Sequence, residues 1–179
     1  MANDLSGTAT PSQDVAKAVG VTPDGVIVVV GEAPAKNGTT GALYLRELYP
    51  NGSAVSTFNG GNVVYVGPGV FGTGCTGLVV RDIEVRPRDA YIYVVGESTG
   101  CTTPSSGWVL SIRSDGAINS GFGSNGNGVS LATAFPGSSP RGIKLRSEDG
   151  LIYMTGLNPG SATSTPPNIS QVLYLQMAQ

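Results

Sequence analysis

The residues of this chain that could carry acid–base or ligand chemistry are chiefly its carboxylates. Histidine is absent, which excludes a Ser-His-Asp arrangement and the commonest general base. Metal sites built on histidine, or on more than the two cysteines present, are excluded as well. Carboxylate-only catalysis, as in glycoside hydrolases, needs two acidic side chains about 5 to 9.5 Å apart in a cleft. The chain has 12 Asp and Glu residues, but no local motif selects a pair.

Two carboxylates recur at equivalent places in the sequence. Glu32 and Glu97 each follow the glycine that ends an apolar run, so we expect both at one rim of the fold, where they could bind a cation or sugar hydroxyls. The third copy of the run has Leu157 at this place. That difference favours solvated carboxylates at strand ends over a repeated binding site, and we expect no metal or other cofactor.

Trp108 is the only tryptophan and the aromatic candidate for ligand binding. It stands beside a variable loop, where an indole ring suits either a carbohydrate-stacking platform or packing between neighbouring sheets. Tyr44 and Tyr174 occupy similar places in the other copies of the repeat, which favours packing.

The two cysteines, Cys75 and Cys101, are placed symmetrically about a predicted hairpin turn. The turn centres near Arg88, which is 13 positions from each cysteine, so the two fall opposite one another across an antiparallel strand pair. We predict a disulfide, which would indicate an oxidising compartment. The alternative is two unrelated free thiols in a cytoplasmic protein.

A segment of about sixty residues occurs twice in the chain and begins a third time. Its clearest mark is the apolar run that ends in glycine, as in Val26–Gly31, Tyr91–Gly96 and Leu151–Gly156. The three glycines are 65 and 60 positions apart, a period typical of β-propeller blades.

Each repeat predicts four short strands, because alternating or apolar runs are separated by turn residues. A polar–apolar strand precedes the apolar run, and a third and a fourth strand follow it. The first strands are Lys17–Val21, Arg81–Val85 and Arg141–Leu145; the third are Ala42–Leu45, Trp108–Ile112 and Val172–Leu175; the fourth are Asn62–Val66 and Val129–Ala134.

The sequence around these turns resembles the delta-60 family of β-propeller repeats. Val21-Thr-Pro-Asp-Gly-Val-Ile-Val-Val-Val-Gly-Glu and Leu48-Tyr-Pro-Asn-Gly-Ser, followed by Phe58-Asn-Gly-Gly, are similar to that family's P-D-G-K-I-L-V-A-G and L-N-P-D-G-S-L-D-x-x-F-G elements. Arg88-Asp89-Ala90 replaces the Asp-Gly in the second copy. The resemblance implies a β-propeller fold and no particular activity.

We therefore expect an all-β fold, a single β-propeller domain over residues 1–179 with about three four-stranded antiparallel blades. Blade 1 spans 15–70, blade 2 spans 71–136 and blade 3, at 137–179, lacks its fourth strand. Residues 1–14 are expected to supply that strand, since Leu5–Ser12 resembles Val129–Gly137. Three blades cannot close a ring, so we predict a homo-oligomer, with a six-bladed dimer favoured. A fragment of a larger propeller, or a ring of three chains, remains open.

Composition limits the partners and the location. The net charge is −2 and the pI is near 5.0, which argues against nucleic acid as a partner. No apolar stretch approaches the roughly 20 residues that span a bilayer, so we expect no membrane insertion. No signal peptide is visible at the amino terminus, yet the low charge and the abundance of Gly, Ser, Thr and Asn favour an extracellular, cell-surface or virion location.

These observations predict a non-enzymatic structural or binding module of a virion or bacterial surface assembly. Attachment to another structural protein or a surface glycan would use the variable loops after the apolar runs, at 33–40, 98–107 and 158–170. The first alternative is a lectin-like propeller that binds carbohydrate through Trp108. The second is a polysaccharide hydrolase or lyase that uses carboxylates such as Glu32 or Glu97 in a central channel.

Overall fold

The structure is a computed structural model that describes residues 14–33, 42–102, 106–123, 126–146, 148–158 and 169–175. Within these ranges the protein is all-β, with antiparallel strands and two short 3-10 helices, η1 (Asn59–Gly61) and η2 (Pro68–Val70). The strand expected at residues 1–14 lies outside the described residues, apart from Asp14.

The strands form three antiparallel sheets, and in each sheet every strand pairs with the next along the chain. The first sheet contains β1 (Val15–Val21), β2 (Ile27–Ala33), β3 (Ala42–Leu48) and β4 (Val64–Val66). The second contains β5 (Gly77–Val85), β6 (Ile92–Thr99), β7 (Ser106–Ile112) and β8 (Val129–Pro136). The third contains β9 (Ser139–Leu145), β10 (Ile152–Asn158) and β11 (Ile169–Leu175). The four strands predicted for each full repeat, and the three predicted for the last, are thus present.

The hairpin turns explain why the strands begin and end where they do. In the first turn, Thr22 Oγ1 accepts a hydrogen bond from the Val26 N–H at 2.9 Å, and Gly25 takes the left-handed conformation at φ 85°. In the second turn, the Arg86 guanidinium donates two hydrogen bonds of 2.7 Å to the Asp89 carboxylate. Ala90 there adopts φ 56°, so the turn keeps a left-handed residue although the sequence has no glycine at that place.

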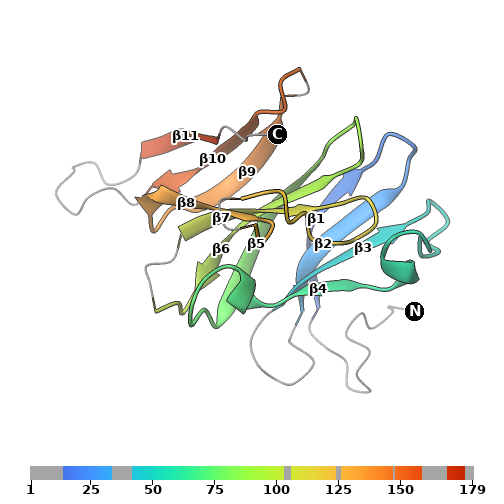
Figure 1. The fold of residues 1–179 in the computed structure, drawn as a ribbon, viewed down its shortest axis with the longest axis horizontal. Coiled ribbons are helices and arrows are strands. Elements are labelled where there is room, and N and C mark those ends of the chain that lie inside the picture. Colours follow the sequence, from blue (N-terminus) through green and yellow to red (C-terminus); the bar gives the residue numbers. More distant parts are fainter. Residues whose placement is uncertain are drawn as a thin grey trace.

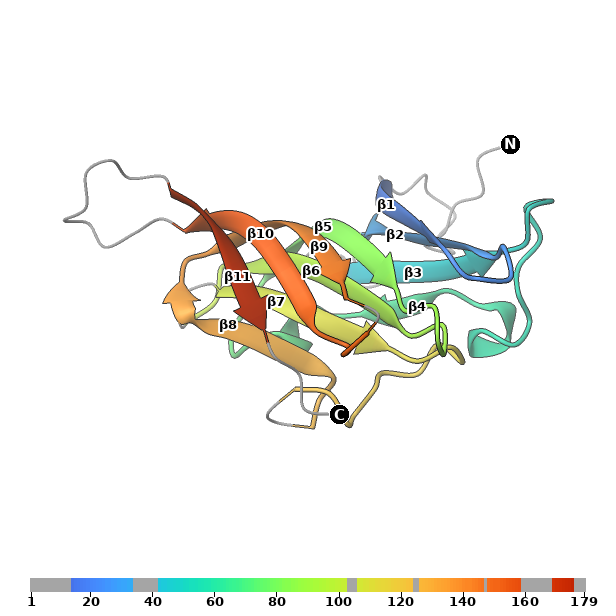
Figure 2. The same cartoon turned by 90° about the horizontal axis from the view of Figure 1, so that it is seen from above.

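The three sheets stack face to face in chain order, as Figures 1 and 2 show. Strand β1 contacts β5, and β5 contacts β9, so the first strand of each sheet lies beside the first strand of the next. One hydrophobic core joins the first and second sheets, and a smaller core joins the second and third. The first core includes Val28, Leu45, Ile83, Val85 and Leu110; the second includes Tyr93, Val109, Ile143, Leu145 and Met154.

Each sheet therefore has one face toward the preceding sheet, here called the upstream face, and one toward the following sheet, the downstream face. On β5 the upstream face carries Ile83 and Val85, and the downstream face carries Asp82 and Glu84. The upstream face of the first sheet and the downstream face of the third sheet have no neighbouring sheet among the described residues.

Candidate functional site

Glu32 and Glu97 lie beside a β-bulge that recurs in the first strand of each sheet. The strand pairing shifts by one residue at Lys17 in β1 and at Arg81 in β5. Each of these basic side chains forms an ion pair with the glutamate on the neighbouring strand: Lys17 Nζ lies 3.1 Å from Glu32 Oε2, and Arg81 binds Glu97. The structure therefore places both glutamates in partly buried ion pairs, rather than leaving them as solvated carboxylates.

The bulge also accounts for the glycine that precedes each glutamate. A Cβ atom on Gly31 would lie 2.3 Å from the Val15 carbonyl oxygen, and one on Gly96 would lie 2.2 Å from that of Val79. Any larger residue would push the bulged strand away. The recurring glycine is thus required by the backbone of the neighbouring strand.

Glu32 has a second role as a link between sheets. Its Oε1 accepts a hydrogen bond of 2.7 Å from the Val80 N–H on β5. The residue of the third sheet that corresponds to Val80 is Pro140, which has no N–H to donate. There Asp82 accepts a 3.0 Å hydrogen bond from the Ile143 N–H instead. Carboxylate-to-backbone hydrogen bonds therefore join both pairs of stacked sheets.

Trp108 is fully buried, which rules it out as a carbohydrate-stacking platform in this structure. Its ring lies over Gly96, and its centroid is 4.2 Å from that of Phe71. Tyr44 lies over Gly31 in the same way. Packing, the interpretation that the repeat favoured, is therefore what the structure shows for Trp108.

Tyr174 does not correspond to these two aromatic residues. The register of the third sheet pairs Gly156 with Gln171 and pairs Tyr174 with Tyr153. In the last copy the residue opposite the glycine is Gln171, three positions before Tyr174. No aromatic residue therefore pairs with Gly156.

The predicted disulfide between Cys75 and Cys101 is confirmed, with an S–S distance of 2.11 Å. The β5–β6 register pairs Gly77 with Thr99. Continued by two residues, the same register places Cys75 opposite Cys101. Backbone hydrogen bonds continue past the bridge, because Thr102 N–H donates to the Thr73 carbonyl at 3.2 Å. A disulfide is consistent with an extracellular protein.

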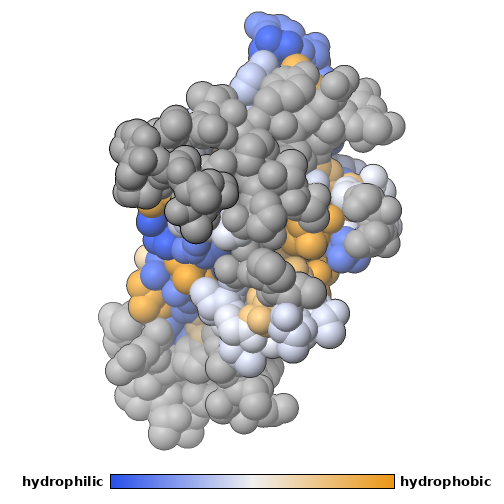
Figure 3. All heavy atoms as spheres, turned by 90° about the vertical axis from the view of Figure 1, so that its left-hand side faces the viewer, coloured by the Kyte–Doolittle hydropathy of each residue, from blue (hydrophilic) through white to orange (hydrophobic). Residues whose placement is uncertain are grey.

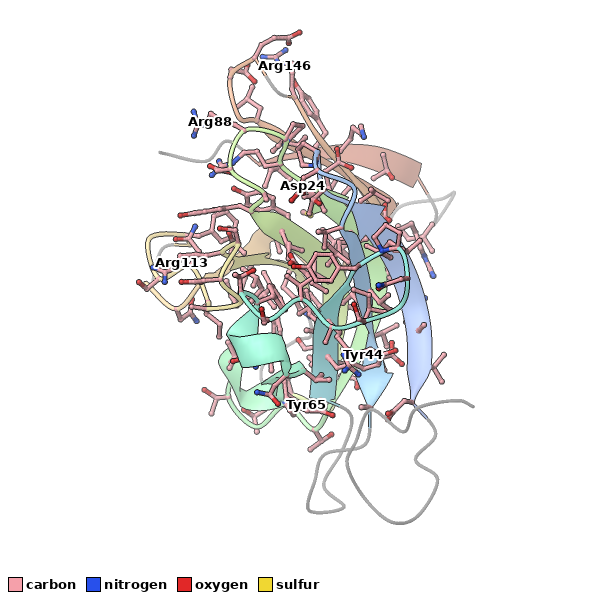
Figure 4. The ribbon with its side chains drawn as sticks, turned by 90° about the vertical axis from the view of Figure 1, so that its right-hand side faces the viewer. Asp24, Tyr44, Tyr65, Arg88, Arg113 and Arg146 are labelled. Atoms are coloured by element: carbon pink, nitrogen blue, oxygen red, sulfur yellow. A yellow bond between two sulfur atoms is a disulfide. The ribbon has the colours of Figure 1, made fainter. Side chains whose placement is uncertain are left out.

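A pocket of about 360 Å³ lies between the turns of the first and second sheets. Its walls include Asp24 from the β1–β2 turn, Tyr49 from the end of β3, Ala90 from the β5–β6 turn and Asp115 from the segment after β7. Figure 4 shows Asp24, one of the lining residues, away from Tyr44 and Tyr65. The pocket is therefore assembled by four turns that are distant in the sequence.

Glu47 is the buried acidic residue of this pocket, and the sequence analysis did not identify it. Its side chain is 6% exposed, and among the described residues no hydrogen bond or ion pair involves its carboxylate. Burial, followed by the nearby charge of Asp24, raises the pKa of Glu47 to about 7. The strand alternation could have revealed it, because Glu47 faces the core together with Leu43 and Leu45.

The two outer faces of the stack differ from the inner ones in exposure. Val19 and Val21 on β1 are 63% and 61% exposed. The residues at the same positions of the second and third sheets, Ile83, Val85, Ile143 and Leu145, are all buried. At the opposite end of the stack Leu157 on β10 is exposed, and Figure 3, turned to the left-hand side of Figure 1, shows hydrophobic atoms beside polar ones among the described residues.

Comparisons with known proteins leave the function open. A scan against protein-family models, a search of curated proteins and a search of solved structures each find no match to this chain. Within the described part of the chain, no helix is long and apolar enough to cross a membrane. The same residues contain no group of three or more Cys, Asp or Glu placed to hold a metal ion.

Proposed function

We propose that the chain is a non-enzymatic β-propeller subunit of a virion or bacterial surface assembly, with three delta-60-type blades that form half of a six-bladed ring. The exposure of Val19 and Val21 is the observation that carries the proposal. The other two sheets bury an aliphatic pair at this position. We therefore expect another sheet to cover the valine pair, because large exposed apolar faces are uncommon on isolated domains.

A second copy of the chain is the occupant that fits this face. Inside the chain, the downstream face of one sheet twice receives the upstream aliphatic face of the next, through hydrophobic packing and a carboxylate-to-backbone hydrogen bond. Among the described residues, no sheet covers the downstream face of the third sheet or the upstream face of the first. Two copies related by a twofold axis would place each third sheet on the partner's first sheet, leaving neither face uncovered.

The partner-binding part of the proposal rests on the loops that follow the second strand of each sheet. These loops are at 33–40, 98–107 and 158–170, and residues 34–40, 103–105 and 159–168 of them lie outside the described residues. They differ in length and sequence while the strands repeat, and variation on a rigid scaffold is typical of binding loops. The lectin and hydrolase alternatives gain no support from Trp108, Glu32 or Glu97, because those side chains are buried or ion-paired.

Light scattering tests the ring directly. The chain has a mass of 18.1 kDa, and we expect about twice this mass across a concentration series. The double variant Val19→Asp/Val21→Asp should be monomeric with an unchanged far-UV circular dichroism spectrum, because four aspartates would be buried per dimer.

The matched control adds the same charge away from the face. Ser56→Asp/Ser120→Asp changes two exposed loop residues and should leave the dimer intact. A wild-type chain that stays monomeric up to high micromolar concentration would overturn the six-bladed ring. A trimeric mass would replace it with a larger ring built through the same faces.

A further inference from the structure

The pocket around Glu47 has features that neither the ring nor the loops explain. Glu47 faces the core side of the first sheet opposite Val28 in the strand register, and Val26 and Val55 line the pocket near it. A largely buried carboxylate is costly unless a hydrogen bond, a water molecule or a cation compensates it. Among the described residues no hydrogen bond or ion pair does so, which leaves the Glu47 carboxylate available to a group that enters the pocket.

The charges around the pocket indicate the sign of that ligand. Three carboxylates line it, those of Asp24, Glu47 and Asp115, and the lining contains no lysine or arginine. Asp115 is already paired with Arg113, whose hydrogen bond and charge lower the pKa of the Asp115 carboxyl. Asp24 accepts a hydrogen bond from Thr22 Oγ1. Glu47 is thus the pocket carboxylate that has no hydrogen bond or ion pair among the described residues, and a cation is the group that would complement its charge.

The other lining residues indicate which kind of cation fits. An ammonium group has three donors, and Thr57 and Ser114, which line the same pocket, carry hydroxyl groups that can accept a hydrogen bond. Val26, Val55 and the Tyr49 ring offer apolar surface for a methylene chain. The volume of about 360 Å³ lies in the range of small-ligand pockets. No set of three or more acidic residues in the described ranges is placed to hold a metal ion.

We propose that this pocket binds an alkylammonium group, either a lysine side chain of a partner protein or a free diamine, with Glu47 as the carboxylate that pairs with it. The site lies within one chain, between its first and second sheets. It is therefore independent of the proposed dimer, and either proposal can fail without the other.

The affinity should depend on pH, because ionised Glu47 is the form that attracts a cation. The pKa of the Glu47 carboxyl is about 7, and the charged groups facing it are Asp24 and the Asp115–Arg113 pair. An alkylammonium with a pKa near 10.4 stays charged from pH 6 to pH 8. Binding should therefore tighten about tenfold over this range, in step with the ionised fraction of Glu47.

The test is a titration followed by isothermal calorimetry and by amide shifts in nitrogen–proton correlation spectra. The probes are Nα-acetyl-lysine N-methylamide and 1,5-diaminopentane, each at pH 6 and pH 8. Nα-acetyl-norleucine N-methylamide is the neutral control, since it keeps the butyl chain and lacks the ammonium. We expect binding of the amines alone, with shifts at Thr22 and Ser114, and at least a tenfold loss of affinity in Glu47→Gln.

A matched variant and a direct readout complete the test. Glu84→Gln removes a partly buried carboxylate that pairs with Lys144 outside the pocket, and it should bind amines as the wild type does. If Glu47→Gln does not fold, the carbon-13 titration of the Glu47 carboxyl in the wild type decides, because amine binding must lower the pKa of that carboxyl.

The possible outcomes separate the two ligand sources and overturn the site if it is wrong. Tighter binding of the lysine derivative assigns the pocket to a partner protein, and tighter binding of the diamine assigns it to a free amine. Binding of the norleucine control, equal affinity in Glu47→Gln, or an unchanged carboxyl pKa with amine present would each overturn the proposal.

Discussion

At the scale of single residues, the structure assigns the acidic side chains to different tasks. Glu32 and Glu97 neutralise the basic residue of a β-bulge, and Glu32 also ties two sheets together. Glu47 differs because it is buried and has no partner among the described residues. The carboxylates that recur in the sequence are therefore architectural, and Glu47, which does not recur, is the candidate for binding.

Glu47 should make stability depend on pH. Its pKa is raised from 4.5 to about 7 in the folded chain, so between these values the folded state binds the proton more tightly than the unfolded state does. The contribution of Glu47 to the free energy of unfolding is therefore largest below about pH 4.5, and it is lost as the pH rises through about 7. We expect a loss on the order of 1–3 kcal/mol, allowing for solvent screening.

Urea unfolding at pH 5 and pH 8 measures this contribution. Glu47→Gln cannot ionise, so the wild type should lose more stability than the variant between the two pH values. Glu84→Gln serves as the control and should behave as the wild type. Equal pH dependence in the wild type and Glu47→Gln would contradict the raised pKa of the Glu47 carboxyl.

Ala90 offers a stabilising substitution at the same scale. It adopts φ 56° in the β5–β6 turn, a conformation that costs an L-residue about 1 kcal/mol and glycine far less. Gly150 occupies the same place in the β9–β10 turn at φ 73°. Ala90→Gly should therefore raise the free energy of unfolding by about 0.5–1 kcal/mol, measured by urea denaturation. A loss of stability would show that the alanine methyl group contributes packing that outweighs the strain.

At the scale of elements, the repeating unit is a hairpin with a bulge opposite a glycine. The bulge brings a backbone carbonyl within 2.5 Å of where a Cβ would lie on Gly31, Gly96 or Gly156, and it turns a basic side chain toward the neighbouring strand. In the first two sheets an aromatic ring from the third strand covers the glycine. The glycine, the basic residue and the ring thus form one structural unit.

The disulfide acts on one such hairpin. It joins the residues that flank β5 and β6, with a sequence separation of 26, and the chain-entropy relation predicts about 3 kcal/mol for a loop of this size. The double variant Cys75→Ala/Cys101→Ala should lose about this much stability in urea unfolding and keep its fold, since both hydrophobic cores are unchanged. Wild-type protein treated with a reductant should match the variant; an unchanged midpoint on reduction would contradict the prediction.

At the scale of the whole molecule, the stack of three sheets has two outer faces that no sheet covers among the described residues, the upstream face of the first sheet and the downstream face of the third. The faces inside the chain are joined by two hydrophobic cores. Repeating that contact between two copies would bury Val19 and Val21 as Ile83 and Val85 are buried. The mass measurement on the Val19→Asp/Val21→Asp variant therefore tests the assembly, whereas the amine titration tests a pocket within one chain.

The sequence by itself determined the strands, their turns and the cysteine pair, because these depend on patterns within one hairpin. Alternating residues place β1, β5 and β9, and turn residues such as Gly25 end them. The symmetric placement of Cys75 and Cys101 about a turn was enough to predict their bond.

Only the tertiary structure decided what the side chains do. Trp108 is buried partly by Phe71, and Glu32 accepts a hydrogen bond from Val80, a residue of another sheet. The pocket at Glu47 is assembled by turns that span from Thr22 to Asp115. Such contacts follow from how sheets stack, and stacking depends on the fit of residues tens of positions apart, which no local pattern of polarity or spacing encodes.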